Sequence, residues 1–359
     1  MKLFSKVVTL ASVLFFSLNA SAIYNYEIHL PKLLNDYFTS LVNDPAAAAV
    51  KSTDVNPGKC SSIYDNLLKD GVLDIHYALG YFDDSVGGTE KTYTRFSNGS
   101  GFENYGRSPS LDIAAYQAIR DFMLAPCKSP HQKICGFSEV GGPLNGKVVF
   151  EKRIDIIGQS ILVRMTLTHA SASQNYVENL TTLNEAQKYL TFQSEQNYFE
   201  SIKDADVIFY NGHSRHGGGP DFTPVVLNAA GTADYEGHYK VLRTGIRRVL
   251  GEVRKRKDNN FILGLFSCYS ASYYQEALFQ AKPGIKTIFT VGSINYFDTI
   301  FSSMGYLEGL LHGSCGEDLT HLARQTDSVR HGILDFNMGS KAPEKMILKP
   351  IPENIRIMD

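Results

Sequence analysis

From about residue 150, short apolar runs alternate with longer amphipathic stretches along the 359-residue chain. The apolar runs include "DVIFY", "FILGLF" and "IKTIFTV", and hydrophobic residues recur at helical spacing after each of them. Runs that are apolar throughout are typical of strands in a parallel sheet that is buried on both faces. A strand followed by a helix is also the unit from which such sheets are built. The pattern therefore predicts an α/β fold with a mostly parallel, Rossmann-like sheet and helices on both faces.

The spacing of hydrophobic residues predicts four helices in this part of the chain. They span about residues 181–202, 238–257, 272–281 and 298–313. Before the first of them, the segment from 146 to 168 predicts two strands joined near Gly158. The residues expected to face inward are Leu183, Ala186, Leu190, Tyr198 and Ile202 in the first helix, and Val241, Leu242, Ile246, Val249, Leu250 and Val253 in the second.

Residues 23–150 have a different texture, because turn-rich segments with many glycine, serine and asparagine residues separate the regular elements. Strand-like stretches occur at 73–82 and 91–96, and a helical pattern occurs at 110–124. We interpret this part as a small α+β accessory domain or pro-domain. The predicted division of the chain is a signal peptide at 1–22, this N-terminal domain at 23–150, the larger α/β domain at 151–335 and a C-terminal tail at 336–359.

The first 22 residues match the pattern of a cleaved secretory signal. Lys2 and Lys6 precede the apolar run "VVTLASVLFF", and Ala20 and Ala22 lie at the small-residue positions of a signal peptidase site. The apolar run is shorter than the roughly 20 residues that a membrane-spanning helix needs. We therefore expect an exported protein, in the periplasm or secreted, without stable membrane insertion. Such a protein folds in an oxidising environment, where disulfides form.

The chain has five cysteines, so at least one cannot pair within it. Cys127 and Cys135 flank a short segment that a bridge could close, and Cys60 and Cys315 could form a longer one. The sequence does not fix the pairing. Cys268 differs from the other four because it follows a strongly apolar run instead of lying in a polar or turn-rich segment. A free thiol in an exported protein needs burial or a function.

Two reactive side chains follow consecutive strands of the predicted parallel sheet. The strand at 206–210 leads to His213, and the strand at 261–266 leads to Cys268. In open parallel sheets, functional residues gather where the carboxyl ends of neighbouring strands meet the loops that follow them. A thiolate is a nucleophile, and an imidazole can protonate the amine that leaves from a peptide bond. These two residues therefore predict acyl-transfer chemistry.

This arrangement resembles the clan of cysteine peptidases that contains the caspases, gingipains, clostripain and legumain. One strand ends at Gly212-His213, and the next ends at Ser267-Cys268, a small residue followed by cysteine. The gingipain-type branch is the most similar. The likeness covers roughly residues 160–330, as judged from the pattern of strands and helices. It implies that the larger domain is a caspase-like catalytic domain.

The resemblance also assigns roles to individual residues. It implies that Cys268 is the nucleophile of a cysteine endopeptidase and that His213 is the general acid and base. It further implies an oxyanion hole formed by the backbone N–H groups of Ser214 and Cys268. A peptidase of this kind acts on a protein or peptide substrate and requires neither a metal nor an organic cofactor.

The sequence departs from the pattern of the clan at several positions. The histidine of the clan is normally followed by glycine, whereas Ser214 follows His213, and the literal His-Gly pair is His216-Gly217. We prefer His213 because it comes closely after the apolar strand. The Gln-Ala-Cys signature of caspases proper is absent. The substrate pocket does not carry over from the clan, and its candidate residues are Asp221, Glu236, Ser293 and Asp298.

A serine hydrolase is the first alternative. The segment from Gly212 to His216 is close to the Gly-x-Ser-x-Gly elbow of lipases and esterases, and Ser214 would then be the nucleophile. The fifth position is a histidine, however, where the strained turn favours a minimal side chain. The acid and the histidine of such a site would have to come from Asp298, His312 or His321.

Two further alternatives are a metal site and a binding protein. His213 and His216 have the H-x-x-H spacing of metal ligands, but no cluster that would supply a third ligand is apparent, so we expect no metal. A caspase-like protein without catalytic activity could instead bind a partner. The formal net charge of -2 gives no basic field that would favour nucleic acid.

Overall fold

The computed structural model describes residues 57–81, 94–95, 102–103, 111–128, 130, 132–144, 147–170, 182–230, 233–294, 296–315, 319 and 355–358. The predicted signal peptide lies outside the described residues. The helices are α3 (Pro57–Leu67), α4 (Leu111–Leu124), α5 (Thr182–Ser201), α6 (Thr244–Lys255), α7 (Ser270–Ala281) and α8 (Tyr296–Leu311). The strands are β1 (Val72–Leu79), β2 (Thr94–Arg95), β3 (Phe102–Glu103), β4 (Ser138–Leu144), β5 (Lys147–Ile156), β6 (Gln159–His169), β7 (Val207–Asn211), β8 (Ile262–Phe266), β9 (Lys286–Thr290) and β10 (Ile355–Met358). Two short helical segments, η2 (Arg215–Gly217) and η3 (Tyr235–Leu242), lie between β7 and α6.

Eight strands form one mixed sheet in the order β10-β9-β8-β7-β1-β6-β5-β4, and β2 pairs with β3 in a separate ribbon. The five strands from β9 to β6 are parallel to one another, whereas the pairings at the edges, β10 with β9, β5 with β6 and β4 with β5, are antiparallel. The predicted α/β class is therefore confirmed. The chain passes from β1 to β6 on one side and then crosses to β7 on the other. Ligands of open α/β sheets bind at such a switch point, outside the carboxyl ends of the strands.

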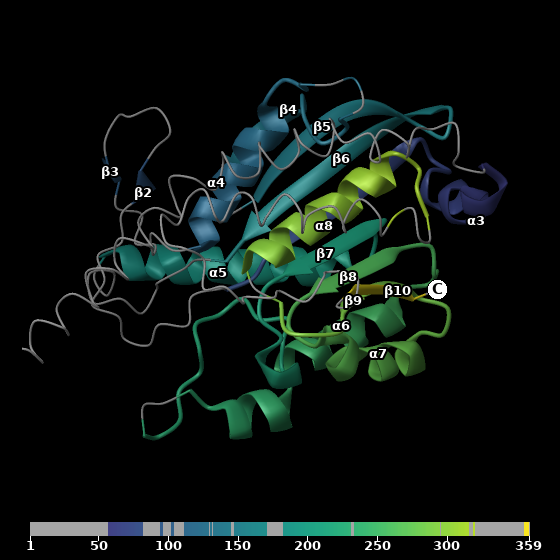
Figure 1. Cartoon of the computed structure of the whole chain (residues 1–359). Coiled ribbons are helices and arrows are strands. Elements are labelled where there is room, and N and C mark those ends of the chain that lie inside the picture. The colour runs from purple at the N-terminus through teal and green to yellow at the C-terminus, as the bar shows by residue number, and fades with distance from the viewer. Residues whose placement is uncertain are drawn as a thin grey trace, which may run out of the picture.

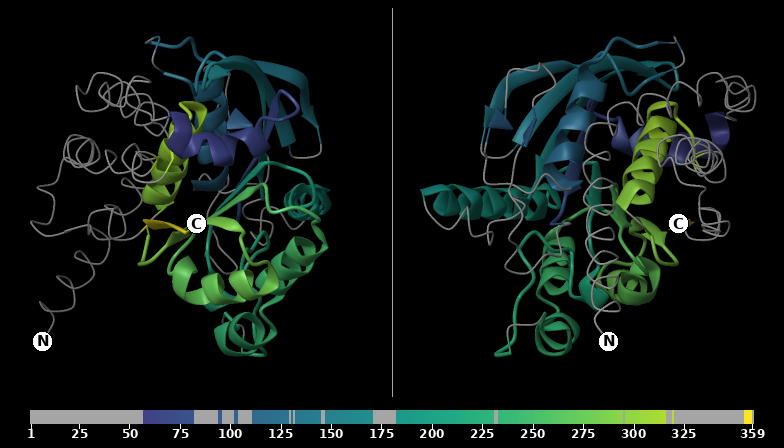
Figure 2. Two further views of the ribbon diagram at one scale, coloured as in Figure 1. Left: turned by 90° about the vertical axis from the view of Figure 1, so that its right-hand side faces the viewer. Right: turned by 60° about the vertical axis from the view of Figure 1, so that its left-hand side comes forward.

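Buried hydrophobic side chains form two clusters, one on each face of the sheet. One cluster joins the sheet to α3, α4 and α8, and the other joins it to α5, α6 and α7 (Figure 1). The two further views show the same two layers of helices on either side of the strands (Figure 2). Strand β7 contributes to both clusters, because Val207 and Phe209 belong to the first and Ile208 and Tyr210 to the second. All four side chains are fully buried, as the uniformly apolar sequence predicts.

The predicted domain boundary at residue 150 does not agree with the structure, because it falls inside β5. Strand β1, from the predicted N-terminal domain, lies between β6 and β7 in the middle of the main sheet. The Cys60–Cys315 disulfide also ties α3 to the end of α8. The described residues before 150 therefore share a sheet and a core with those that follow. The segment 355–358, predicted as part of a tail, forms strand β10 against β9.

The helix predicted over 238–257 is divided in two by Arg243, whose backbone is left-handed with a φ of 48°. Beyond this break Ile246, Val249 and Val253 are buried on α6, as predicted, and Leu250 packs against the same core. Before it Val241 and Leu242 are 63% and 49% exposed, so their predicted inward position is wrong. Residues at helical spacing share one face only within a continuous helix, and the helix is interrupted at Arg243.

The first predicted helix, α5, agrees better with its predicted face. Tyr198 is fully buried on α5, and so is Ile202 one residue past its end, whereas Leu190 is half-buried. The side chains of Leu183 and Ala186 lie outside the described residues. The two strands predicted around Gly158 are β5 and β6, which form an antiparallel hairpin.

The cysteines pair as the sequence allows. Cys60 bonds to Cys315 and Cys127 to Cys135, which leaves Cys268 as the free thiol. The predicted presence of disulfides is thus confirmed, and the structure supplies the pairing that the sequence left open. Within the described ranges, no helix combines the length and the apolar character that crossing a membrane requires.

Candidate active site

The strands that precede His213 and Cys268 lie next to each other in the sheet. Strands β7 and β8 are parallel neighbours, and their last residues, Asn211 and Phe266, are register partners. The backbone N–H of Gly212 donates to the Phe266 carbonyl at 3.3 Å, which continues the pairing past the strand ends. His213 comes two residues after Asn211, and Cys268 comes two residues after Phe266. Both therefore follow the carboxyl ends of adjacent strands, at the same edge of the sheet.

Cys268 lies in a partly exposed turn between β8 and α7. Its thiol donates to the Ile294 carbonyl at 3.3 Å, and the Ile294 N–H lies 3.5 Å from the sulfur. The hydroxyl of Ser293 is 3.8 Å from the same sulfur. The sulfur also precedes the amino end of a 12-residue helix, whose dipole favours negative charge there. The sulfur is therefore partly exposed and is bonded to the segment that follows β9.

Hydrogen bonds fix the turn that carries Cys268. The N–H of Tyr269 donates to the Gly292 carbonyl at 2.7 Å, and Tyr269 has a left-handed backbone with a φ of 53°. The hydroxyl of Ser270 donates to the Leu265 carbonyl at 2.7 Å and accepts from the Thr290 N–H at 2.8 Å. The turn is therefore bonded to both β8 and β9.

The loop after β7 is held by two buried tyrosine hydroxyls. Tyr210, in β7, donates to the His213 carbonyl at 3.0 Å, and Tyr274, in α7, donates to the Ser214 carbonyl at 2.8 Å. His213 is half-buried and Ser214 is buried. Among the described residues, the backbone N–H of neither Ser214 nor Cys268 has a hydrogen-bond acceptor. These are the two N–H groups predicted to form the oxyanion hole.

A buried ion pair closes the same loop. The Arg215 guanidinium donates to the Asp221 carboxylate at 2.8 Å, with the two side chains 2% and 9% exposed. The other carboxylate oxygen accepts from the N–H and the hydroxyl of Thr223. Asp221 therefore binds its own loop, and its role as a substrate-pocket residue stays a prediction. Arg243 adds a further link by donating to the Gly217 carbonyl at 3.0 Å.

The other predicted site residues are divided between positions near the thiol and positions away from it. Ser293 lies beside Cys268, as described above. Glu236 is exposed and paired with Lys240. Asp298 is in α8, and its side chain lies outside the described residues. His216 is exposed and packs against the Tyr235 ring, with 4.9 Å between ring centroids.

The partners that a serine elbow would need do not gather around Ser214. His312 bonds to the Glu308 carboxylate at 3.0 Å, near the end of α8 where Tyr64 donates to the Leu310 carbonyl. Tyr64 belongs to α3, which leads into the amino end of β1. His312 thus lies toward the amino ends of the strands, whereas Ser214 follows a carboxyl end. His321 lies outside the described residues.

Backbone strain is concentrated around the two loops. Five non-glycine residues of the described chain have positive φ angles, and one of them, Ile157, lies in the β5–β6 hairpin turn. The other four border the candidate site: Arg215, His216, Arg243 and Tyr269. Strained backbone of this kind persists only where surrounding contacts hold it, and it is common at functional sites.

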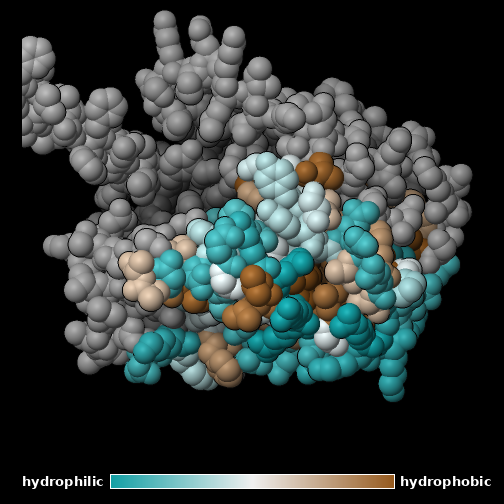
Figure 3. Space-filling model, turned by 90° about the horizontal axis from the view of Figure 1, so that it is seen from below, coloured by the Kyte–Doolittle hydropathy of each residue, from teal (hydrophilic) through white to brown (hydrophobic). Residues whose placement is uncertain are grey.

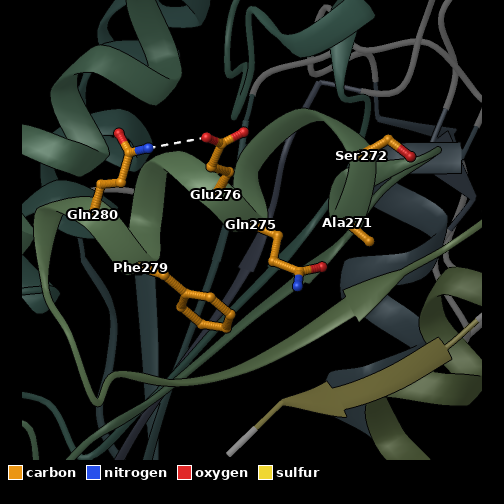
Figure 4. A pocket seen from close by; sticks show the side chains of 6 residues that line it. All are labelled: Ala271, Ser272, Gln275, Glu276, Phe279 and Gln280. Atoms are coloured by element: carbon orange, nitrogen blue, oxygen red, sulfur yellow. Dashed lines mark hydrogen bonds between the residues drawn. The ribbon is translucent and has the colours of Figure 1, made fainter.

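An open hollow of about 520 Å³ lies along α7, the helix that follows Cys268. Its lining residues all belong to that helix, and the Gln280 amide donates to the Glu276 carboxylate at 3.0 Å, one turn away along the helix (Figure 4). None of the predicted site residues lines this hollow. The underside of the molecule, where η3, α6 and α7 lie, shows hydrophobic residues interspersed among hydrophilic ones (Figure 3). Within the described residues, no three histidine, cysteine or acidic side chains are grouped so that they could hold a metal ion.

Comparisons of the chain with protein-family models, with curated proteins and with solved structures give no match. The geometry of the candidate site is therefore the basis for a proposed function.

The groups that hold the two loops could not be recognised in the sequence. In the sequence, Tyr210 and Tyr274 have the pattern of ordinary core aromatic residues. A buried tyrosine ring gives the same apolar signal whether or not its hydroxyl makes a specific hydrogen bond. The Arg215–Asp221 ion pair could not be predicted either, because charged residues in a loop are usually exposed and do not indicate a particular partner. A signal was present in the glycines: Gly212 follows Tyr210 closely, and it leaves room for the phenol to fold back under the loop.

Proposed function

We propose that this protein is an exported cysteine endopeptidase with a caspase-like or gingipain-like site formed by Cys268 and His213. The observation that carries the proposal is the register of β7 and β8, because it brings the free, partly exposed thiol and the imidazole to adjacent positions of one sheet edge. Such a pair supplies a nucleophile and a general acid and base. The concentration of strained backbone around both loops supports a functional role for this edge.

The proposed reaction has two stages. The Cys268 sulfur attacks the carbonyl carbon of a peptide bond, and the proton of the thiol passes to His213. The amine then leaves with that proton, and a thioester between Cys268 and the substrate remains. In the second stage His213 takes a proton from water, which hydrolyses the thioester and frees the thiol.

Negative charge develops on the carbonyl oxygen in both stages. The backbone N–H groups of Ser214 and Cys268 are the proposed donors to this oxygen, and both lack an acceptor among the described residues. Among the described residues, the hydrogen-bond partners of the Cys268 sulfur are uncharged, namely Ser293 and the peptide of Ile294. Asp221 is paired with Arg215 within its own loop.

Two other functions remain open to test with the same protein. A serine hydrolase would use the hydroxyl of Ser214 as its nucleophile. Among the contacts described above, no histidine bonds to this hydroxyl to act as its base. A binding protein with an inactive site would contain an unreactive Cys268. The cysteine peptidase is favoured because Cys268 is partly exposed and lies at the amino end of α7.

The test combines thiol labelling with peptide cleavage on the purified, non-reduced protein. Iodoacetamide should label Cys268 rapidly, as located by peptide mass spectrometry, because the other four cysteines are in disulfides. Cleavage of a mixed peptide library should be lost in Cys268→Ala and in His213→Ala, and kept in Ser214→Ala. Ser214→Ala is the matched control because it removes a hydroxyl from the same loop and keeps the backbone N–H. Cleavage that survives Cys268→Ala and disappears in Ser214→Ala would replace the thiol mechanism by a serine mechanism.

A further inference from the structure

The hydroxyl of Tyr210 determines the direction of one particular peptide unit. It donates to the His213 carbonyl at 3.0 Å, and this carbonyl shares its peptide unit with the N–H of Ser214. A peptide unit is planar and trans, so its C=O and N–H point in opposite directions. The bond from Tyr210 therefore holds the Ser214 N–H away from the core on which the Tyr210 ring packs.

We propose that Tyr210 is a positioning residue that directs the Ser214 N–H toward the oxygen of the substrate carbonyl. This inference rests on the proposed function, in which that N–H stabilises the oxyanion. Tyr210 acts through the peptide and does not touch the substrate. The same hydroxyl accepts from the Asp221 N–H at 2.9 Å and lies 3.1 Å from the Asp221 carbonyl. It thereby joins the start of the loop, at His213, to the end of the loop.

Two glycines make room for this phenol. A Cβ atom at Gly212 would overlap the Tyr210 hydroxyl, and one at Gly80 would come within 2.7 Å of it. Gly80 follows β1 and Gly212 follows β7, so the hydroxyl occupies the switch point between these two strands. Asp221 is fixed independently, because its carboxylate binds Arg215 and its carbonyl accepts from the Tyr81 N–H at 3.0 Å. The slot therefore holds the hydroxyl in one place.

The hydroxyl stays protonated in the working range of a thiol and an imidazole. Burial raises the pKa of Tyr210 well above its usual value, so the phenol is a donor at neutral and at alkaline pH. Removing it should lower activity without moving the pH values at which activity rises and falls. A loss of acid or base function would instead change the shape of the pH profile.

Tyr274→Phe is the matched control for Tyr210→Phe. Both tyrosines are fully buried, and each hydroxyl donates to a carbonyl of the same loop. The carbonyl that Tyr274 binds belongs to Ser214, and the N–H of that peptide unit is on Arg215. Tyr274→Phe therefore removes a similar bond without affecting the orientation of the Ser214 N–H.

The experiment compares two reactions of the same thiol. Alkylation by iodoacetamide forms no oxyanion, whereas acylation by a peptide substrate does. Tyr210→Phe should leave the alkylation rate at Cys268 unchanged and lower kcat for peptide cleavage by about 10-fold or more, since losing an oxyanion donor entirely costs roughly 10²–10³-fold. KM and the inflections of the pH profile should stay as in the wild type. Tyr274→Phe should keep both rates.

Other results would overturn the inference. Equal losses of kcat in Tyr210→Phe and Tyr274→Phe would show that the loop needs both hydroxyls only for its fold, and a parallel fall of alkylation and acylation would show that the thiol itself had moved. A wild-type protein that alkylates but never acylates would reject the proposed function, and the inference with it. If Tyr210→Phe does not fold, the structure of the wild type with a peptide aldehyde bound to Cys268 gives the answer. A Ser214 N–H that points away from the aldehyde oxygen would contradict the inference.

Discussion

The two ends of the central parallel strands differ in the kind of residues they carry: reactive groups lie at the carboxyl ends, and stabilising links lie at the amino ends. At the carboxyl ends of β7 and β8, the backbone is strained, and a thiol and an imidazole lie in loops held by buried hydroxyls. At the amino ends of the strands, the chain is held by a covalent link and by hydrogen bonds. The Cys60–Cys315 disulfide lies there, and Tyr64 donates to the carbonyls of Leu310 and Ser314 at 3.0 and 2.8 Å.

This difference follows from the geometry of a strand followed by a helix. The carboxyl end of a parallel strand leads to the amino end of a helix, where unpaired N–H groups and the helix dipole favour negative charge. Cys268 lies at such a junction before α7. The amino end of a strand receives the carboxyl end of a helix and lacks these donors. Chemistry that develops negative charge is therefore favoured at one edge of the sheet, and the other edge is free to hold the fold together.

The comparison predicts that changes at the two edges have separate consequences, and the largest effect is expected at the carboxyl edge. His213→Ala should lower the rate of peptide cleavage by roughly 10²–10⁴-fold, the contribution of a general acid and base. Its thermal midpoint should change little because the side chain is only half-buried. Measuring kcat/KM and thermal unfolding on the same sample checks both parts.

His216→Ala is the control for this prediction, since His216 is an exposed histidine of the same loop. We expect it to retain activity. An inactive His216→Ala with an active His213→Ala would transfer the role to the second histidine and would separate the site from the register of β7 and β8.

The opposite result is expected at the amino edge. Replacing Cys60 and Cys315 together by alanine should lower the free energy of unfolding by about 2–5 kcal/mol, because the bridge closes a long loop in the unfolded chain. The sequence separation is 255 residues, against 8 for Cys127 and Cys135. Urea unfolding of both double variants measures the contrast. Activity well below the unfolding midpoint should be kept, and a folded but inactive Cys60/Cys315 variant would contradict the separation of the two edges.

Much of the fold could be predicted from the sequence because it depends on local patterns. The uniformly apolar runs of β7, β8 and β9 predict buried parallel strands, and the chain order predicts that His213 and Cys268 reach one edge. The position of β1 in the middle of the sheet could not be predicted, because strand pairing across about 130 residues leaves no periodic signal. The turn-rich texture of residues 23–150 suggested a separate domain instead.

The candidate site could be predicted only in its reactive residues. The sequence gives the identity of a reactive cysteine or histidine directly, but it does not give the orientation of a peptide unit. The roles of Tyr210, Tyr274 and the Arg215–Asp221 pair depend on distances of about 3 Å between groups brought together by the tertiary fold. Val241 and Leu242 show the same limit, since their helical pattern continues across the break at Arg243.

The smallest expected effect concerns the pH dependence of stability at the amino edge. Asp206 accepts a hydrogen bond from the Asp74 N–H at 2.9 Å, and burial raises the pKa of its carboxyl to about 7. The folded state therefore binds more protons than the unfolded state between about pH 4 and pH 7, and this group makes the protein less stable as the pH rises through that window. Asp206→Asn keeps an oxygen that accepts from the Asp74 N–H and removes the charge.

His76 acts in the opposite direction, because burial lowers the pKa of its imidazole to about 3. Its stabilising contribution is full above the unfolded-state pKa of about 6.5 and is lost as the pH falls toward 3. The wild-type curve contains both contributions, so the useful quantity is the difference between Asp206→Asn and the wild type. This difference in unfolding free energy should be near zero at pH 4 and should favour the variant by about 1–2 kcal/mol at pH 8, allowing for solvent screening of a half-buried group. Urea unfolding across this pH range measures the difference. A difference that does not change with pH would show that burial does not raise the pKa of Asp206 in the folded protein.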